Sequence, residues 1–167
     1  MGKLLEISTK SNLRSNKALR SCLPYKQAVT VGITFTVEDM QKHVMVKELI
    51  KKLELDGKKT TVMCYLPHDK VNYEFLFDFF SNKDFSFFGK LTSSKAIDFA
   101  STAFDYLFYL DTEPNPLILN LLARSKAKCR MGKFWDEGEP FFEFMLETTS
   151  DTKGLIDGIY RYTSILH

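Results

Sequence analysis

The stretch Phe104–Gly132 constrains the fold of this chain more than any other segment. An apolar run, Tyr106–Leu110, ends abruptly at the acidic, proline-containing loop 111–116, and a helix-period stretch and a second short apolar strand follow. Strand, short loop, helix and strand in this order are typical of α/β proteins with parallel sheets. In such sheets ligands bind beyond the carboxyl ends of the strands, so the acidic loop lies where a binding site is expected.

The same order of elements occurs earlier in the chain. Ala28–Phe35 is a β-branched apolar run, and its continuous hydrophobicity predicts a strand that is buried on both faces. A helix over Val37–Leu55, capped by Thr36, and a second strand over Lys59–Leu66 follow. Together they predict a right-handed βαβ unit.

The end of the chain predicts one more strand, over Phe141–Glu147, and a last helix over Thr152–Leu166. Only about nine residues separate this strand from the preceding one at Ala127–Met131, too few for a crossover helix, so we expect antiparallel pairing. Residues 71–103 fit either short strands or aromatic helix turns. The predicted fold is α/β: a three-layer, Rossmann-like open sheet of five or six mostly parallel strands, with an antiparallel edge hairpin.

The charge of the chain is unevenly distributed. The net charge is +2, but residues 1–27 contain six Lys or Arg and one Glu, so the remaining residues carry a net −3. We expect residues 1–27 to form a basic N-terminal helical arm of one or two turns, and residues 28–167 to form a single α/β domain. Such an arm suits either docking on its own domain or an electrostatic contact with another molecule.

The three cysteines, Cys22, Cys64 and Cys129, show no CxxC or Cys/His spacing of a zinc site. Three unpaired thiols predict a reducing compartment, with Cys64 and Cys129 buried in strands as inert groups. The N-terminus is charged without an apolar stretch, unlike a signal peptide, and no run approaches the ~18 apolar residues of a membrane span. We therefore expect a soluble, cytoplasmic protein.

Five polar residues are candidate ligand-binding residues because they follow predicted strands. They come from three loops that the fold brings to one edge of the sheet: Thr36, His68, Asp111, Thr112 and Asn115. Carboxylates in the acidic loop suit a hard cation or sugar hydroxyls. The same composition also suits an ordinary helix N-terminus, at which Asp, Thr and Asn side chains bind free N–H groups before a proline.

The sequence predicts neither a cofactor nor a metal, and it identifies no catalytic residue. No glycine-rich phosphate-binding motif is present, which disfavours ordinary nucleotide binding. His68-Asp69 has the composition of a base with its orienting carboxylate, but no nucleophile elbow accompanies it, so we interpret His68 as a solvated loop residue.

The residues from about Val29 to Leu166 resemble a family of small bacterial cytoplasmic proteins of unknown function. The stretches that carry the resemblance are Ser86–Lys90, Phe104–Asp111, Ala123–Gly132 and Phe141–Glu147. The basic N-terminal segment is similar as well. This resemblance implies a fold class and no mechanism.

A narrower resemblance covers Phe104–Gly132, which is similar to the acceptor-side domain of heptosyltransferase-type glycosyltransferases. In those enzymes an apolar strand ending in Asp precedes a helix rich in Leu and Ala. They need a second domain for the sugar-nucleotide donor, for which this chain is too short. The resemblance implies a lone half without the donor site.

We predict a non-catalytic module that binds a small ligand, a protein partner or a second copy of the chain, and we expect neither nucleic-acid binding nor a membrane span. The alternative is an enzyme that acts on sugars or phosphorylated metabolites, with Asp111 as base or metal ligand.

Overall fold

A computed structural model describes residues 2–73, 77–148 and 151–167. Six strands of the described residues form one open, all-parallel sheet in the order β3-β2-β1-β4-β5-β6. The strands are β1 (Thr30–Thr36), β2 (Lys59–Tyr65), β3 (Asp78–Phe80), β4 (Tyr106–Tyr109), β5 (Cys129–Lys133) and β6 (Phe144–Leu146). The order reverses between β1 and β4, which makes this pair the topological switch point of the sheet.

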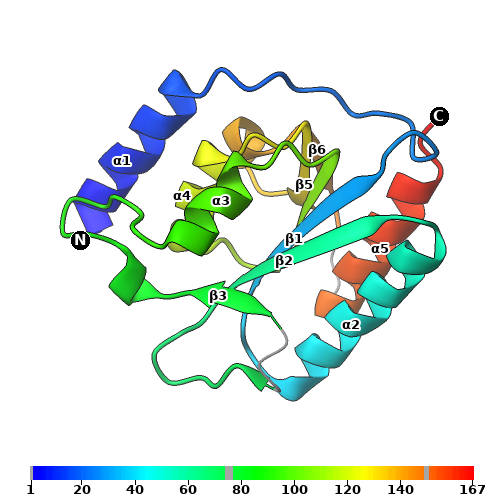
Figure 1. Ribbon diagram of the computed structural model, residues 1–167, viewed down its shortest axis with the longest axis horizontal. Coiled ribbons are helices and arrows are strands. Elements are labelled where there is room, and N and C mark those ends of the chain that lie inside the picture. The colour runs from blue at the N-terminus through cyan, green and yellow to red at the C-terminus, as the bar shows by residue number, and fades with distance from the viewer. Residues whose placement is uncertain (1, 74–76, 149–150) are drawn as a thin grey trace.

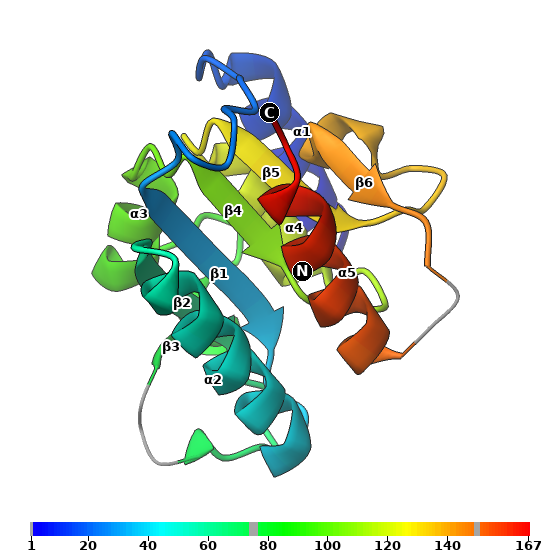
Figure 2. The ribbon, with the colours of Figure 1, turned by 90° about the vertical axis from the view of Figure 1, so that its right-hand side faces the viewer.

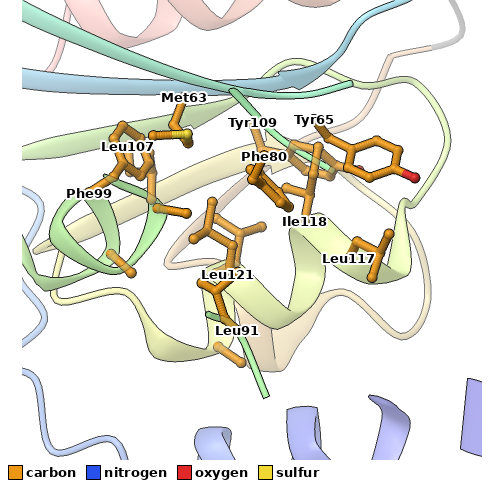
Figure 3. Packing of buried hydrophobic residues seen from close by; sticks show 14 of the residues in the cluster. Met63, Tyr65, Phe80, Leu91, Phe99, Leu107, Tyr109, Leu117, Ile118 and Leu121 are labelled. Carbon is orange, nitrogen blue, oxygen red and sulfur yellow. The ribbon is translucent and has the colours of Figure 1, made fainter. Parts of the chain in front are cut away.

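Helices cover both faces of the sheet, which confirms the predicted α/β open sheet (Figures 1 and 2). One face packs against α2 (Met40–Leu55) and α5 (Thr152–Ser164), and the other against α3 (Ser94–Ser101) and α4 (Pro116–Arg124). The short 3-10 turns η2 (Asn82–Asp84) and η3 (Glu139–Phe141) lie in the connections. Figure 3 shows the core on the α3–α4 face, where Leu107 and Tyr109 of β4 lie above Ile118 and Leu121 of α4.

The predicted antiparallel edge is wrong, because β6 pairs parallel to β5, with Met131 beside Phe144 and Lys133 beside Leu146. The connection, residues 134–143, crosses the sheet without an α-helix. Its aromatic side chains take the place of a helix: Phe142 lies over Gly132, where an added Cβ would be 2.7 Å from the ring. Arg130 of β5 also holds the connection, since its guanidinium donates to the carbonyl of Pro140 at 3.2 Å. Packed rings and one arginine thus allow a crossover shorter than usual.

The N-terminal helix α1 (Gly2–Ser15) is longer than the one or two turns predicted, and it packs along α4. Asn120 of α4 donates to the hydroxyl of Thr9 at 2.9 Å, and Asn16, just after α1, donates to the carbonyl of Ala123 at 3.0 Å. Leu5 is buried in the core of the domain. Residues 2–15 therefore dock on the α/β domain. No helix among the described residues is long and apolar enough to cross a membrane.

Two of the three cysteines form a disulfide, so the prediction of three free thiols is wrong for Cys22 and Cys129. Their Cα atoms are 4.9 Å apart although 107 positions separate them in the sequence. Cys22 lies in the segment 16–29, which runs from α1 to β1 past the amino ends of the strands (Figure 1). Cys64 is free and buried, and burial raises the pKa of its thiol to about 12, which makes it the inert thiol that was expected.

Within residues 71–103, for which either short strands or aromatic helix turns were predicted, the described residues contain β3, η2 and α3. Residues 74–76 lie outside the described residues, so the prediction for this part of the segment is not tested.

Candidate functional site

Thr36 and Asp111 meet at the carboxyl edge of the sheet, where β1 and β4 lie side by side. Thr36 is the last residue of β1, and Asp111 follows β4. The main-chain N–H of Thr36 donates to Oδ1 of Asp111 at 2.8 Å, and the Thr36 hydroxyl donates to Oδ2 at 2.6 Å. Thr36 therefore does not cap α2 as predicted. The cap is Asp39, whose side chain accepts a hydrogen bond from the N–H of Lys42.

A buried lysine completes this pair. Nζ of Lys42, in the first turn of α2, lies 2.7 Å from Oδ1 of Asp111 and 2.7 Å from Oε1 of Glu38. The side chains of Lys42 and Asp111 are only 1% and 4% exposed, whereas Glu38 is 47% exposed. Two buried opposite charges stabilise each other where either one alone would be costly.

Sequence reasoning missed Lys42, although the pattern of α2 contained a sign of it. Lys42 continues the buried stripe of this helix, together with Val46, Leu49 and Leu53. A lysine in an apolar stripe at helical spacing indicates a buried charge, and a buried charge requires a partner of opposite sign. Asp111 was the carboxylate already placed at this edge.

Asn115 joins the network from the start of α4. Its Nδ2 donates to the Thr36 hydroxyl oxygen at 2.8 Å, and its Oδ1 accepts from the N–H of Leu117 at 3.0 Å. Its own N–H donates to the Tyr109 hydroxyl at 2.8 Å. Burial raises the pKa of Tyr109 well above its ordinary value, so that phenol stays protonated. Asn115 caps α4 before Pro116, which is the helix-capping interpretation of the acidic loop.

The structure brings three of the five candidate residues together and separates the others. Thr36, Asp111 and Asn115 share one hydrogen-bond network. Thr112 lies beside it, half-buried, and its carbonyl accepts from Lys133 Nζ at 3.1 Å. His68 is exposed in the loop after β2 and has no hydrogen bond to these residues among those described. Only three of the candidates thus act as a unit.

An open groove of about 560 Å³ lies over this network. We call it the edge groove, and it is lined by Gly2, Leu5, Thr36, Glu38, Tyr65, Asp111, Thr112, Glu113, Pro114, Asn115, Pro116 and Leu117. Its walls are largely apolar, since Leu5 comes from α1, Tyr65 from the end of β2 and Leu117 from α4. Two carboxylates, those of Glu38 and Glu113, lie at its rim, and Glu113 is exposed without an ion-pair partner among the described residues.

The edge groove continues past the end of α1 into a second depression of about 630 Å³. The two share Gly2, Leu5 and Pro116, and the second is walled mainly by Leu13, Leu119, Trp135 and Phe141. An apolar surface therefore extends along both sides of the first turns of α1. The volume of each of the two depressions lies within the range of ordinary ligand-binding clefts.

The edge offers little for a cofactor among the described residues. No group of three or more His, Cys, Asp or Glu there is arranged to hold a metal ion. At the start of α2, where a Rossmann-like protein would place a phosphate, the Asp39 carboxylate accepts the free N–H of Lys42. The carboxylate of Asp111 is bound by Lys42 and Thr36.

A comparison with models of protein families gives a match over residues 2–166 to a family described as a family of unknown function (DUF6913). Searches of the curated proteins and of the solved structures give no match.

Proposed function

The chain belongs to the DUF6913 family, whose function is unknown, and from its site we propose that it is a non-catalytic module that binds a short segment of another protein in the edge groove. The segment would be apolar and would carry Lys or Arg. Two features of the groove support this: the polar groups of its floor already bind one another, and its rim is acidic.

The hydrogen bonds within this floor are the observation that carries the proposal. Both carboxylate oxygens of Asp111 are hydrogen-bonded, to Thr36 and to Lys42, and the Thr36 hydroxyl also accepts from Asn115. A general base must reach the proton that it removes, and the Asp111 carboxylate is only 4% exposed and paired with Lys42. Here the polar groups bind one another, so they are best explained as the support that holds β1, β4, α2 and α4 in place under the groove.

The walls and the rim indicate the class of ligand. Leu5, Tyr65 and Leu117 offer apolar contact area, and buried apolar area is the main source of affinity at interfaces. The exposed carboxylate of Glu113 and the half-exposed one of Glu38 give the rim a negative charge. A positive group on the ligand would gain from this charge in specificity and in association rate.

An enzyme acting on sugars or phosphorylated metabolites, with Asp111 as its base, is the alternative. It has less support, because Asp111 is 4% exposed and paired with Lys42. Neither the search of the curated proteins nor that of the solved structures gave a match that would support the local resemblance to heptosyltransferase-type enzymes.

Two further expectations remain proposals. Nucleic acid is not the expected partner, since two of the six basic groups of residues 1–27 already bind carboxylates of the chain itself, Lys10 that of Glu6 and Arg20 that of Glu143. A cytoplasmic location stays a prediction, and the cysteines no longer support it, because a disulfide is typical of oxidising compartments.

The test uses two labelled peptides that differ only in charge, acetyl-Lys-Phe-Phe-Lys-amide and acetyl-Glu-Phe-Phe-Glu-amide, titrated with the full chain by fluorescence anisotropy. We expect the basic peptide to bind at least about tenfold more tightly, a difference of about 1.4 kcal/mol. Glu113→Lys should remove most of this preference. Glu54→Lys, an equal charge change at the far end of α2, should leave it intact. Equal binding of both peptides would overturn the proposal. If neither peptide binds wild type, the same titration on Phe87→Ser/Phe88→Ser decides, and binding of neither peptide there would overturn the proposal as well.

A further inference from the structure

A turn beside the edge groove holds two phenylalanines out in solvent. Phe87 and Phe88 are 72% and 73% exposed, and their rings contact each other edge to face with centroids 5.6 Å apart. They lie in the turn Ser86–Lys90, which we call the aromatic turn. Large apolar side chains exposed as a pair are typical of interaction surfaces rather than of ordinary solvent-exposed loops.

The aromatic turn is built firmly at its base. The N–H of Ser86 donates to the carbonyl of Lys90 at 2.8 Å, and the N–H of Gly89 donates back to the carbonyl of Ser86 at 2.9 Å. On either side, Phe85 and Leu91 are buried and form a β-bridge. The exposure of the two rings between them is therefore fixed by the fold, and rigid aromatic side chains are effective anchors at interfaces.

Gly89 seats the turn against α1, next to the edge groove. Its φ is +72°, and an added Cβ would lie 2.8 Å from Cα of Leu5, so only glycine allows this approach. The hydroxyl of Ser8 donates to the Gly89 carbonyl at 2.9 Å. Leu5 also lines the groove, so turn and groove share one end of α1. Figure 1 shows the segment before α3 running past that end of α1.

The charges of turn and groove are opposite. Lys90 belongs to the turn and Lys83 lies shortly before it, both exposed and without ion-pair partners among the described residues. The groove has the carboxylates of Glu113 and Glu38 at its rim. An aromatic pair flanked by lysines has the chemistry that the groove is proposed to bind, but the rings of one molecule are exposed to solvent and do not line its own groove.

We propose that the edge groove of one copy receives the aromatic turn of a second copy, in a dimer with two-fold symmetry. The inference rests on the proposed function, because it names the basic, apolar segment that the groove takes. Since turn and groove are neighbours at one end of the molecule, two copies exchange turns reciprocally. A self-complementary patch of this kind closes as a dimer, whereas a head-to-tail contact between separated surfaces would form rings or filaments.

The first test is sedimentation velocity of the full chain over a range of concentrations. We expect wild type to dimerise and Phe87→Ser/Phe88→Ser to be monomeric. Leu19→Ser/Leu55→Ser, which removes two exposed apolar side chains elsewhere, should dimerise like wild type. A monomeric wild type, or a dimer that survives the loss of both phenylalanines, would overturn the proposal. So would a monomer that binds phosphatidylserine vesicles through the two rings.

A charge exchange tests which surfaces meet. Lys90→Glu and Glu113→Lys should each weaken dimerisation at least about tenfold, because each sets like charges opposite each other at both contacts. An equal mixture of the two variants restores an opposite-charge pair at each contact, so it should form a heterodimer of nearly wild-type affinity. A mixture that stays monomeric would contradict this pairing.

The failure of the dimer and the failure of the proposed function give different results. The peptide titration is repeated on Phe87→Ser/Phe88→Ser, whose groove no second copy occupies. If wild type is monomeric while this variant binds the basic peptide, the dimer is refuted and the groove remains a binding site. If the variant binds neither peptide, the proposed function fails, and the dimer proposal fails with it.

Discussion

Lys42 and Asp111 are 69 positions apart in the sequence, and their side chains form a buried ion pair with 2.7 Å between Nζ and Oδ1. The pair fastens α2 to the loop after β4 across the switch point of the sheet. Burying two charges is favourable only when the remaining hydrogen bonds are complete. Thr36 completes them for Asp111, and Glu38 does so for Lys42.

Removing the lysine should therefore be costly. Lys42→Met leaves Asp111 as an uncompensated buried charge, and we expect the free energy of unfolding to fall by about 3–5 kcal/mol. Urea unfolding near neutral pH measures it, with Lys51→Met on the exposed side of α2 as the matched control. The double variant Lys42→Met/Asp111→Leu should recover a large part of the loss. A loss below about 1 kcal/mol in the single variant would refute a structural role for the pair.

His43 makes stability depend on pH near neutrality. It is fully buried among Phe35, Tyr73 and Phe77, and neither ring nitrogen has a hydrogen-bond partner among the described residues. Burial lowers the pKa of His43 below its ordinary value of 6.5. The unfolded chain therefore binds a proton at a pH at which the native state does not. The contribution of neutral His43 to stability is fully present above pH 6.5 and is lost as the pH falls below this value.

The measurement for His43 is urea unfolding between about pH 7.5 and about pH 5.5, for wild type and for His43→Leu. Wild type should lose stability over this range, and the leucine variant should lose less because it has no proton to bind. Equal losses in the two proteins would show that other groups cause the pH dependence.

Asp105 makes the stability depend on pH in a separate, acidic range. Burial alone would raise its pKa, but hydrogen bonds from Lys128 and from the N–H groups of Val29 and Thr30 lower it from 3.8 to about 2. The stability that it contributes is present above pH 3.8 and is lost as the pH falls toward 2. Asp105→Asn should cost about 2 kcal/mol at neutral pH and much less at about pH 2. A difference that persists undiminished in acid would contradict this assignment.

The disulfide should appear in a count of reactive thiols. Denatured protein should show one thiol, that of Cys64, without reductant and all three cysteines after reduction. Reduction should lower the free energy of unfolding by about 2–5 kcal/mol, because the bond closes a long loop in the unfolded chain. Three reactive thiols in unreduced, denatured protein would show that Cys22 and Cys129 are not joined.

The sequence was sufficient to predict the parts of the fold that depend on local pattern. Continuous apolar runs indicated the buried parallel strands, and the positions after them placed Thr36, Asp111 and Asn115 at one edge. These inferences held because the carboxyl ends of parallel strands meet at the same edge of a sheet, whatever the details of packing.

The contacts that could not be predicted from the sequence are those between distant residues. The link between Cys22 and Cys129 depends on how segment 16–29 crosses the sheet, and the parallel pairing of β6 depends on Phe142 packing over Gly132. His68 was placed with the other candidates from its position after β2, but that loop leaves it exposed and apart from them. A position just after a strand predicts that a residue lies at the carboxyl edge of the sheet. Which of these residues form one site depends on the contacts between their side chains.

Binding in the edge groove is tested most directly by recording amide NMR spectra of isotope-labelled Phe87→Ser/Phe88→Ser protein while the basic Lys-Phe-Phe-Lys peptide is added. The proposal predicts that the amide signals which shift, at saturation, cluster at Leu5, Thr36, Glu113 and Leu117, which line the groove. Shifts that cluster on another surface, such as the outer face of α2 and α5, or no shifts at saturating peptide, would contradict it.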